Sequence, residues 1–396
     1  MDNTLVIEPY VDIVVGNKSV LLYNPLSGDR CVSSEQTIVS LFARDNSNLY
    51  SFDVSAQIVN DKKFIEFVHD ISRKGIGKVL QSKVVAPVQL NPAHNLQFVS
   101  VTNKSSKLQI SHLNIVDVAL YLNGATQKQT YADAYKQFLC CKKGNGHIEL
   151  NDIVSFLEPL RDNNSIVRLH LLGGNIFEYP QIETLLHFLE DNFPKAVLYI
   201  HCNFTDLTED CVLTSEHKHK FIVTIYPDDD KERLSMYTSL ECEFQFVVES
   251  ENDLENVEQH VSNYHIGKYS IVPYYNGLNM KFFEENVFTT ADDILQQPVS
   301  MNEIQKSKAI NTSNFGRIII DLDGKVYDNI NFPPIGQCND SVVQVAEKEI
   351  SEKLRWFSIR NNIEPCKHCL YRYLCSPMGN LEYFMNKNNL CHAYQD

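Results

Sequence analysis

Stretches typical of β-strands alternate with stretches typical of helices between residues 113 and 275, and this alternation limits the possible folds most strongly. Strands that alternate with helices form βαβ units, in which neighbouring strands run parallel within one sheet. About six such units predict an α/β fold with a partial (β/α)6 barrel, whose functional residues lie at the carboxyl ends of the strands. The strand-like runs are residues 116–122, 167–172, 197–200, 221–225, 244–248 and 270–274, and the helical ones include 131–139, 182–189 and 255–264.

Length and composition indicate a folded protein of several domains. The chain has 396 residues, of which 43% are hydrophobic and 21% charged, which predicts about two or three domains. Its net charge of −15 argues against a dedicated nucleic-acid-binding protein, which carries clustered basic residues. The eleven cysteines form no extracellular framework, and the first residues lack a signal peptide. No window approaches the roughly 20 apolar residues of a membrane helix, so the sequence predicts a cytoplasmic protein without a membrane partner.

Four cysteines gather near the C-terminus. Cys366 and Cys369 are separated by two residues, Cys375 follows after five more, and Cys391 is the last. A Cys-x-x-Cys pair supplies two ligands from one turn, and two further thiols complete a tetrahedral set. Thiolates suit both zinc and iron–sulfur clusters. The spacing therefore predicts a site for one [4Fe–4S] cluster or, alternatively, for a structural zinc ion. Four unrelated cysteines are the remaining alternative.

Residues 1–85 have the pattern of a small separate module. Its strand signals come first and its helical signals follow, and a hairpin is predicted around Gly16-Asn17. Three short strands followed by helices predict a winged-helix-like layout. The predicted strands are residues 11–15, 19–23 and 30–32, and the helices are marked by apolar positions at 38, 41 and 42 and by residues 64–71.

This order of strands and helices resembles the RiPP recognition element, a module that binds the leader peptides of ribosomally made natural products. The resemblance implies that a peptide adds as an extra strand against the third strand and the last helix of the module. A structural cap domain is the alternative interpretation of the same pattern. The residues implied in peptide binding are Arg30, Cys31, Val32, Phe64, Phe67, Val68 and Ile71.

Residues 301–396 contain a strand, a turn at Asp323-Gly324, a returning strand, Ile335-Gly336, a helical stretch over 342–357 and then the cysteines. This order resembles the SPASM extension of radical SAM enzymes, and the partial barrel before it resembles their catalytic barrel. Such extensions commonly hold two auxiliary clusters. The resemblance assigns Cys366, Cys369, Cys375 and Cys391 to the outer cluster, whereas Gly379 and Asp328-Asn329 stand where the inner cluster needs cysteines.

Residues 86–300 form the barrel in this interpretation, and they lack the motifs of the catalytic family. The loop after the first strand carries Cys-x3-Cys-x2-Cys in the family, but Thr126, Thr130 and Asp133 stand at these positions. Hydroxyls and one carboxylate cannot replace three thiolates around an iron–sulfur cluster. The family also ends the second strand with Gly-Gly-Glu-Pro, where this chain has Gly173-Gly174-Asn175-Ile176. The resemblance therefore implies a barrel for which no S-adenosylmethionine is expected.

The whole chain resembles the pseudo-radical-SAM proteins that accompany radical SAM peptide maturases in bacterial RiPP systems. This resemblance implies a non-catalytic subunit that binds a precursor peptide and pairs with a catalytic radical SAM maturase. A redox protein whose single cluster passes electrons to a substrate or partner is the alternative from another class. A structural cap on another assembly is the third alternative.

Overall fold

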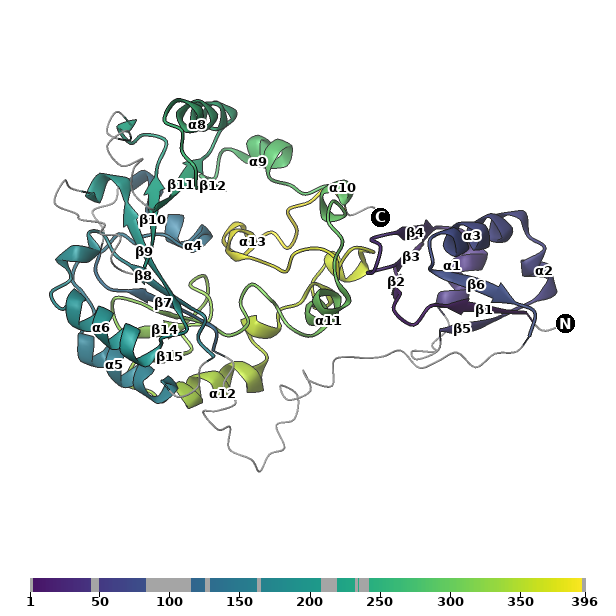
Figure 1. The fold of residues 1–396 in the computed structure, drawn as a ribbon, viewed down its shortest axis with the longest axis horizontal. Helices are drawn as coiled ribbons and strands as arrows, with labels where there is room; N and C mark the ends of the chain where they lie inside the picture. Colours follow the sequence, from purple (N-terminus) through teal and green to yellow (C-terminus); the bar gives the residue numbers. More distant parts are fainter. Residues whose placement is uncertain are drawn as a thin grey trace.

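The computed structural model describes residues 3–43, 50–82, 115–124, 129–161, 165–207, 219–231, 234 and 242–393. Its main body is built on a nine-stranded sheet in the order β12-β11-β10-β9-β8-β7-β13-β14-β15 (Figure 1). Strands β7 to β12 run parallel in sequence order, which confirms the predicted α/β fold with a parallel sheet. These strands are β7 (Asp117–Tyr121), β8 (Arg168–Leu172), β9 (Val197–Asn203), β10 (Lys220–Ile225), β11 (Cys242–Val248) and β12 (Tyr269–Pro273).

The C-terminal segment extends the same sheet. Strand β13 (Arg317–Ile320) pairs parallel with β7, and β14 (Lys325–Tyr327) and β15 (Gly336–Gln337) follow as antiparallel neighbours. Gly324 lies in the predicted turn with a φ of +75°, a conformation that favours glycine. Because β13 lies beside β7, the C-terminal segment and the parallel strands share one hydrophobic core.

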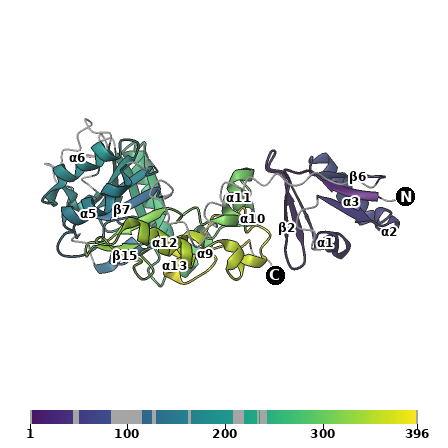
Figure 2. The ribbon, with the colours of Figure 1, turned by 90° about the horizontal axis from the view of Figure 1, so that it is seen from below.

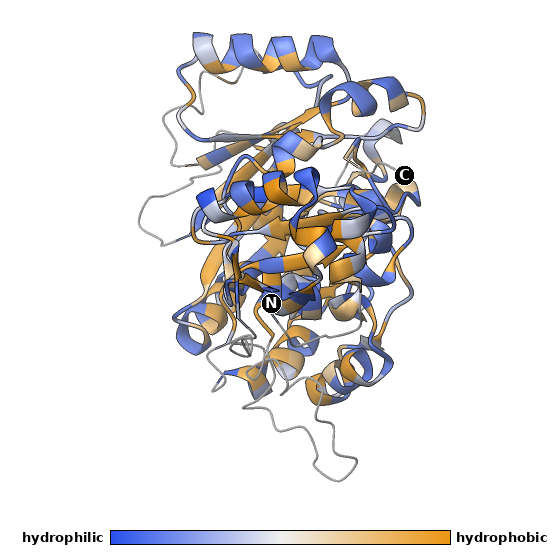
Figure 3. Ribbon diagram, turned by 90° about the vertical axis from the view of Figure 1, so that its right-hand side faces the viewer, coloured by the Kyte–Doolittle hydropathy of each residue, from blue (hydrophilic) through white to orange (hydrophobic). Residues whose placement is uncertain are grey.

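Helices cover the outward face of the sheet. Alternate residues of β7 point to opposite faces, so Val118 and Leu120 contribute to the core beneath these helices, whereas Ala119 and Tyr121 line the inner face. Figure 3 shows the apolar strands in the interior and helices of mixed character around them. The helices that share this core are α5 (Leu150–Leu157), α6 (Ile182–Asn192), α8 (Glu251–Asn263), α9 (Met280–Asn286) and α12 (Val342–Glu352).

Several shorter helices connect the sheet to the cysteine-rich end. Helices α11 (Met301–Ala309) and α12 each begin with a reciprocal capping box, formed by Ser300 with Glu303 and by Ser341 with Gln344. Within the described part of the chain, none of the helices has the length and apolar character required to cross a membrane. The remaining helices of the body are α4 (Ala134–Gln137), α10 (Ala291–Ile294), α11 (Met301–Ala309) and α13 (Asn380–Met385), with 3₁₀ turns η4 (Gln129–Tyr131), η5 (Glu158–Leu160), η6 (Ile176–Glu178), η7 (Phe204–Asp206), η9 (Arg355–Phe357), η10 (Arg360–Asn362) and η11 (Cys366–His368).

The N-terminal module contains two three-stranded sheets with helices around its own core. The sheet β2-β3-β4 matches the three strands expected from the sequence, whereas the sheet β5-β1-β6 was not expected. Figures 1 and 2 show the module at one end of the molecule, next to α10 and α11. Its elements are β1 (Asn3–Ile7), β2 (Asp12–Val15), β3 (Val20–Tyr23), β4 (Arg30–Ser33), α1 (Gln36–Phe42), β5 (Ser51–Val54), α2 (Ala56–Val59), α3 (Lys62–Arg73) and β6 (Gly77–Leu80).

Candidate functional site

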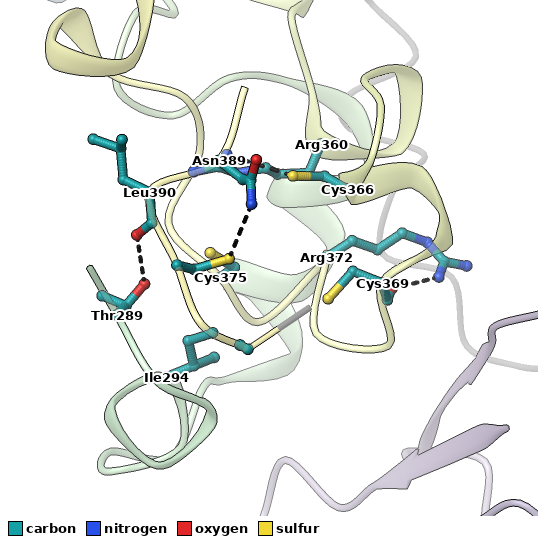
Figure 4. A pocket seen from close by; sticks show the side chains of 11 residues that line it. Thr289, Ile294, Arg360, Cys366, Cys369, Arg372, Cys375, Asn389 and Leu390 are labelled. Carbon is teal, nitrogen blue, oxygen red and sulfur yellow. Dashed lines mark hydrogen bonds between the residues drawn. The ribbon is translucent and has the colours of Figure 1, made fainter. Parts of the chain in front are cut away.

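The four C-terminal cysteines line one pocket. Its volume is about 400 Å³, which includes space that is open to solvent. Figure 4 shows Cys366, Cys369 and Cys375 on different sides of this space, with Arg360 close to Cys366. Cys391 completes the set of thiols. The structure therefore brings together all four cysteines that the spacing predicted as ligands.

Local hydrogen bonds explain how the chain gathers these thiols. The amide of Cys369 donates to the carbonyl of Cys366 at 2.9 Å and closes the tight turn between them. The amide of Cys375 donates to the carbonyl of Tyr371 at 2.8 Å in a second turn. Cys391 arrives from further along the chain, where it forms an isolated bridge with Thr289. Two turns and one bridge thus bring the four cysteines to the lining of one pocket.

Nitrogen donors surround these sulfur atoms. The amide of Tyr371 lies 3.4 Å from the Cys369 sulfur, and Asn389 Nδ2 lies 3.8 Å from the Cys391 sulfur. The Nη1 atom of Arg360 lies 3.7 Å from the Cys366 sulfur. Hydrogen bonds from N–H groups stabilise a thiolate and its bond to a metal. The donors therefore fit a site that holds metal-bound thiolates.

Burial controls the ionisation of the free thiols. It raises the pKa of Cys366 and Cys369, and it raises the pKa of Cys375 to about 11, while the Arg360 guanidinium opposes this shift. These thiols therefore carry protons near neutral pH until a metal displaces them. Within the residues that the structure describes, no group of three or more His, Cys, Asp or Glu side chains is arranged around a single metal ion.

Buried amides occupy the region where the resemblance implied a second cluster. Asp328 and Asn329 are fully buried, and Asn329 Nδ2 donates to Asn314 Oδ1 at 3.2 Å and to Asn380 Oδ1 at 2.7 Å. Gly379 directly precedes Asn380, so both substituted positions lie close together. Amide groups that satisfy each other are poor ligands for iron in a sulfide cluster. The residues present do not fit a second cluster.

A buried aromatic cluster lies where β10 and β12 end, at the carboxyl ends of the parallel strands, a place that we term the barrel mouth. The segment after β7 turns back over the sheet, where Tyr131 stacks on Tyr226 with ring centroids 4.5 Å apart and meets Tyr274 at 5.2 Å. Phe138 and Cys140 belong to the same buried cluster. The helix expected over residues 131–139 is reduced to α4, because the residues on both sides of it bury their side chains in the barrel.

The loop positions compared with the cluster motif have other roles. The carbonyl of Thr130 accepts a hydrogen bond from the Tyr274 hydroxyl at 2.9 Å, and Asp133 forms an ion pair with Lys136 at 2.8 Å. Thr126 lies outside the described residues. Thr130 thus holds this segment against Tyr274, whereas the ion pair of Asp133 is local to α4.

Gly173, directly after β8, allows a close contact with Asn123, and the carboxylate of the family's motif at this place is replaced by the amide of Asn175. A Cβ atom on Gly173 would lie 1.9 Å from Asn123 Oδ1, so this approach requires glycine. The Oδ1 atom of Asn175 accepts from the amide of Phe177 at 3.2 Å and caps η6. Asn175 Nδ2 donates to Glu178 at 3.1 Å. The amide that replaces the family's carboxylate is therefore used in a local turn.

A buried polar chain inside the barrel was not expected from the sequence. His170 Nδ1 lies 2.9 Å from His201 Nε2, and Asp117 lies 3.5 Å from His170 on its other side. Arg317 and Arg168 bind the other oxygen of Asp117, at 2.8 and 3.0 Å. Burial lowers the pKa of His170 to about 4, although Asp117 opposes this shift, so the imidazole is neutral near pH 7. The sequence did contain a signal for this chain, because Asp117, His170 and His201 each stand between apolar residues of a strand stretch, where a polar side chain must be buried.

The residues predicted to bind peptide divide into buried and accessible groups. Strand β4 is the edge of its sheet, and α3 contacts it. Cys31, Phe64, Phe67 and Ile71 are buried in the core of the module, whereas Arg30 and Val68 are half-buried and Val32 is 47% exposed. Ile65 on α3 is 53% exposed and was not among the predicted residues. Val32 pairs with Leu21 and points to the outer face of its sheet, whereas Ile65 is exposed on α3, which packs on the inner face.

Comparisons with known proteins identify similar structures only. No protein-family model matches the chain, and no curated protein matches it either. The structure of Streptococcus suis SuiB bound to precursor peptide SuiA has a TM-score of 0.46 and 13% sequence identity, and the match covers 99% of each chain. The structure of BtrN in complex with AdoMet and 2-DOIA has a TM-score of 0.39 and 14% identity, and covers 66% of this chain and 98% of that chain.

Proposed function

We propose that this chain is a non-catalytic, radical-SAM-like subunit that binds a precursor peptide and works beside a catalytic radical SAM maturase. The filled barrel mouth is the observation that carries the proposal. In the family that the sequence resembles, the segment after the first strand carries cluster ligands, and the mouth receives S-adenosylmethionine. Here Tyr131 and Phe138 from that segment pack against Tyr226 and Tyr274. A barrel filled by its own side chains acts as a scaffold.

The N-terminal module supplies the peptide-binding surface in this proposal. An edge strand presents unpaired N–H and C=O groups, and an extended peptide satisfies them by adding as a further strand. Strand β4 is such an edge, and the exposed side chain of Val32 offers an apolar contact beside it. The buried Phe64, Phe67 and Ile71 support this surface from within the module.

The four-cysteine site holds one [4Fe–4S] cluster in this proposal. A zinc ion needs all four sulfur atoms at about 2.3 Å from one point, whereas a cubane cluster spreads its thiolates over a larger body. The four thiols line one pocket, and their spacing along the chain matches the outer cluster of the family that the sequence resembles. When bound, the cluster cross-links the chain and supplies one-electron redox chemistry. Cys366, Cys369, Cys375 and Cys391 would hold it.

Two assays test the proposed function. Anaerobically reconstituted protein, mixed with S-adenosylmethionine and dithionite, is expected to form no 5′-deoxyadenosine above a protein-free blank. Formation of 5′-deoxyadenosine with turnover would overturn the non-catalytic assignment. Affinity purification from native cells, followed by mass spectrometry, is expected to recover a protein with Cys-x3-Cys-x2-Cys and a short precursor peptide. Absence of both partners would refute the assignment to peptide maturation.

A peptide recovered in this way allows a sharper test of the binding surface. Val32→Asp is expected to weaken binding at least tenfold, because it places a charge beside the edge strand. Leu26→Asp is the matched control, since Leu26 is 74% exposed on the turn between β3 and β4. Equal affinity of Val32→Asp and Leu26→Asp would exclude the β4 edge as the binding site.

Electron transfer is a second candidate function, and one observation favours it. Cys369, Cys375 and Cys391 are half-buried rather than buried, so a cluster held by them reaches close to the protein surface. Protein loaded with zinc instead of iron and sulfide separates the two functions. If zinc-loaded protein supports the partner's activity fully, the site is structural. If only the iron–sulfur form supports it, the site transfers electrons.

A further inference from the structure

The sheet β2-β3-β4 packs its outer face against the body of the protein. Residues alternate along β3, so Val20 and Leu22 contribute to the core of the module, whereas Leu21 and Tyr23 point to the other side. Leu21 and Tyr23 join Val14 of β2 in a separate buried cluster with residues of the body. The module is therefore docked through a dedicated apolar face, distinct from its own core.

The segment that connects the metal-site cysteines forms much of the opposing surface. Leu374 is buried in the shared cluster, and Leu370, Tyr371 and Tyr373 pack against it. These residues lie between Cys369 and Cys375 and form turns rather than a helix or strand. Both ends of this segment are thus candidate ligands.

Backbone contacts bring the module and the cysteine turn close together. A Cβ atom on Gly16, in the β2–β3 turn, would lie 3.0 Å from a methyl group of Leu370 and 3.2 Å from the carbonyl oxygen of His368. Arg372 bridges the two sides, because it donates to the carbonyl of Cys369 at 2.8 Å and to that of Val15 at 3.3 Å. One side chain thus links a candidate ligand directly to β2.

Polar contacts with α11 and with the residue before its N-cap also hold the N-terminal module against the body. The Tyr23 hydroxyl accepts a hydrogen bond from the amide of Val299 at 2.7 Å. Asp12, which is buried, forms an ion pair with Lys308 of α11. Breaking such a pair leaves an uncompensated charge in a buried place, so this contact favours one docking geometry.

We propose that loading of the four-cysteine site fixes segment 366–375 and thereby locks the N-terminal module onto the body. The site then acts as a metal-dependent brace that determines where the β4 edge is held. This inference rests on the proposed function in one respect: the β4 edge, whose position the brace would fix, is the edge proposed to bind peptide. The physical basis is general: ligands at both ends of a short irregular segment remove its alternative conformations, and metal binding contributes that free energy to the fold.

The test compares full-length protein in three states: reconstituted with iron and sulfide, loaded with zinc, and freed of metal by a chelator. Small-angle X-ray scattering reports the radius of gyration, and hydrogen exchange reports the amides of residues 12–23. Removal of metal is expected to increase the radius of gyration and to accelerate exchange in this stretch roughly tenfold or more. Far-UV circular dichroism is expected to change little.

Two variants control for the docking contact itself. Leu21→Asp places a charge on the docking face and is expected to release the module while the metal content stays at the wild-type level. Leu26→Asp, at an exposed position of the same module, is expected to behave as wild type. The inference would be overturned if residues 12–23 exchanged equally with and without metal, or if the metal-free chain unfolded as a whole. Scattering and exchange are measured without peptide, so they test the brace independently of peptide binding. If metal removal released the module but the protein bound no peptide, the brace would stand and the proposed function would be refuted.

Discussion

Arg360 binds both carboxylate oxygens of Glu382, with an Nη1–Oε1 distance of 2.7 Å and an Nη2–Oε2 distance of 3.1 Å. Both side chains are almost fully buried. The same Nη1 atom lies 3.7 Å from the sulfur of Cys366. A planar guanidinium held at two points cannot rotate away, so Glu382 fixes the direction of the donor that faces the sulfur.

Arg360→Lys tests this arrangement. Lysine keeps the positive charge but loses the two-point contact with Glu382, so the free energy of unfolding is expected to fall by about 1–3 kcal/mol. The rate of metal loss to a chelator is expected to rise, because the Cys366 sulfur loses an oriented donor. Arg73→Lys is the matched control, since Arg73 forms an exposed pair with Asp70, and such pairs contribute little. Equal metal retention in both variants would show that the oriented donor is dispensable.

Tyr131→Ala tests whether the filled barrel mouth is a packed core. Removal of a buried aromatic ring is expected to lower the free energy of unfolding by about 3–5 kcal/mol, measured by chemical denaturation. Tyr131→Phe keeps the ring stacked on Tyr226 and is expected to cost much less. We expect no 5′-deoxyadenosine from Tyr131→Ala with S-adenosylmethionine, because the single buried thiol of Cys140 cannot replace the three cysteines of the family's motif. Stability equal to wild type would mean that the aromatic residues cover the mouth loosely.

The parallel sheet was predictable from the sequence because strand runs rich in Val, Ile and Phe record their burial locally. The gathering of the four cysteines was also predictable, since a Cys-x-x-Cys turn is a local feature. The filled barrel mouth was not, because contacts such as that between Tyr131 and Tyr274 join distant parts of the chain. The exposed position of Ile65 was missed for a related reason: apolar residues on a helix do not reveal which of them the module's core leaves uncovered.

Glu349→Gln tests a buried carboxyl group of α12. Glu349 accepts a hydrogen bond from the amide of Trp356 at 2.5 Å, and burial, together with nearby Asp328, raises its pKa to about 8. The folded chain therefore keeps a proton that the unfolded chain releases near pH 4.5, so this group's contribution is fully present below that pH and is lost as the pH rises to about 8.

The glutamine variant is expected to remove this dependence, which amounts to at most about 1.4 kcal/mol per pH unit. Compared with wild type, it should be more stable at alkaline pH and should differ least at acidic pH. Glu347→Gln on the exposed side of the same helix serves as the control. Chemical denaturation at a series of pH values measures the effect. Parallel pH profiles for wild type and Glu349→Gln would contradict the assignment of this carboxyl group.

Cys375→Ala and Cys338→Ala separate the metal site from the other buried thiols. Cys375 lines the four-cysteine pocket, whereas Cys338 lies in the main hydrophobic core. Loss of one of four ligands is expected to reduce bound iron and sulfide at least twofold, because three thiolates leave one corner of the cluster without protein support. Cys338→Ala removes a small apolar contact and no ligand, so its iron and sulfide content is expected to match that of wild type.

Iron, sulfide and zinc analysis of anaerobically purified protein, with a visible absorption spectrum, measures both variants against wild type. About four irons and four sulfides per wild-type chain are expected from a single [4Fe–4S] cluster. About eight irons would contradict the interpretation of the amide network around Asn329 as a place without a cluster. Zinc without iron would reduce the site to a structural brace, and electron transfer would then be excluded, because zinc has no redox chemistry in proteins.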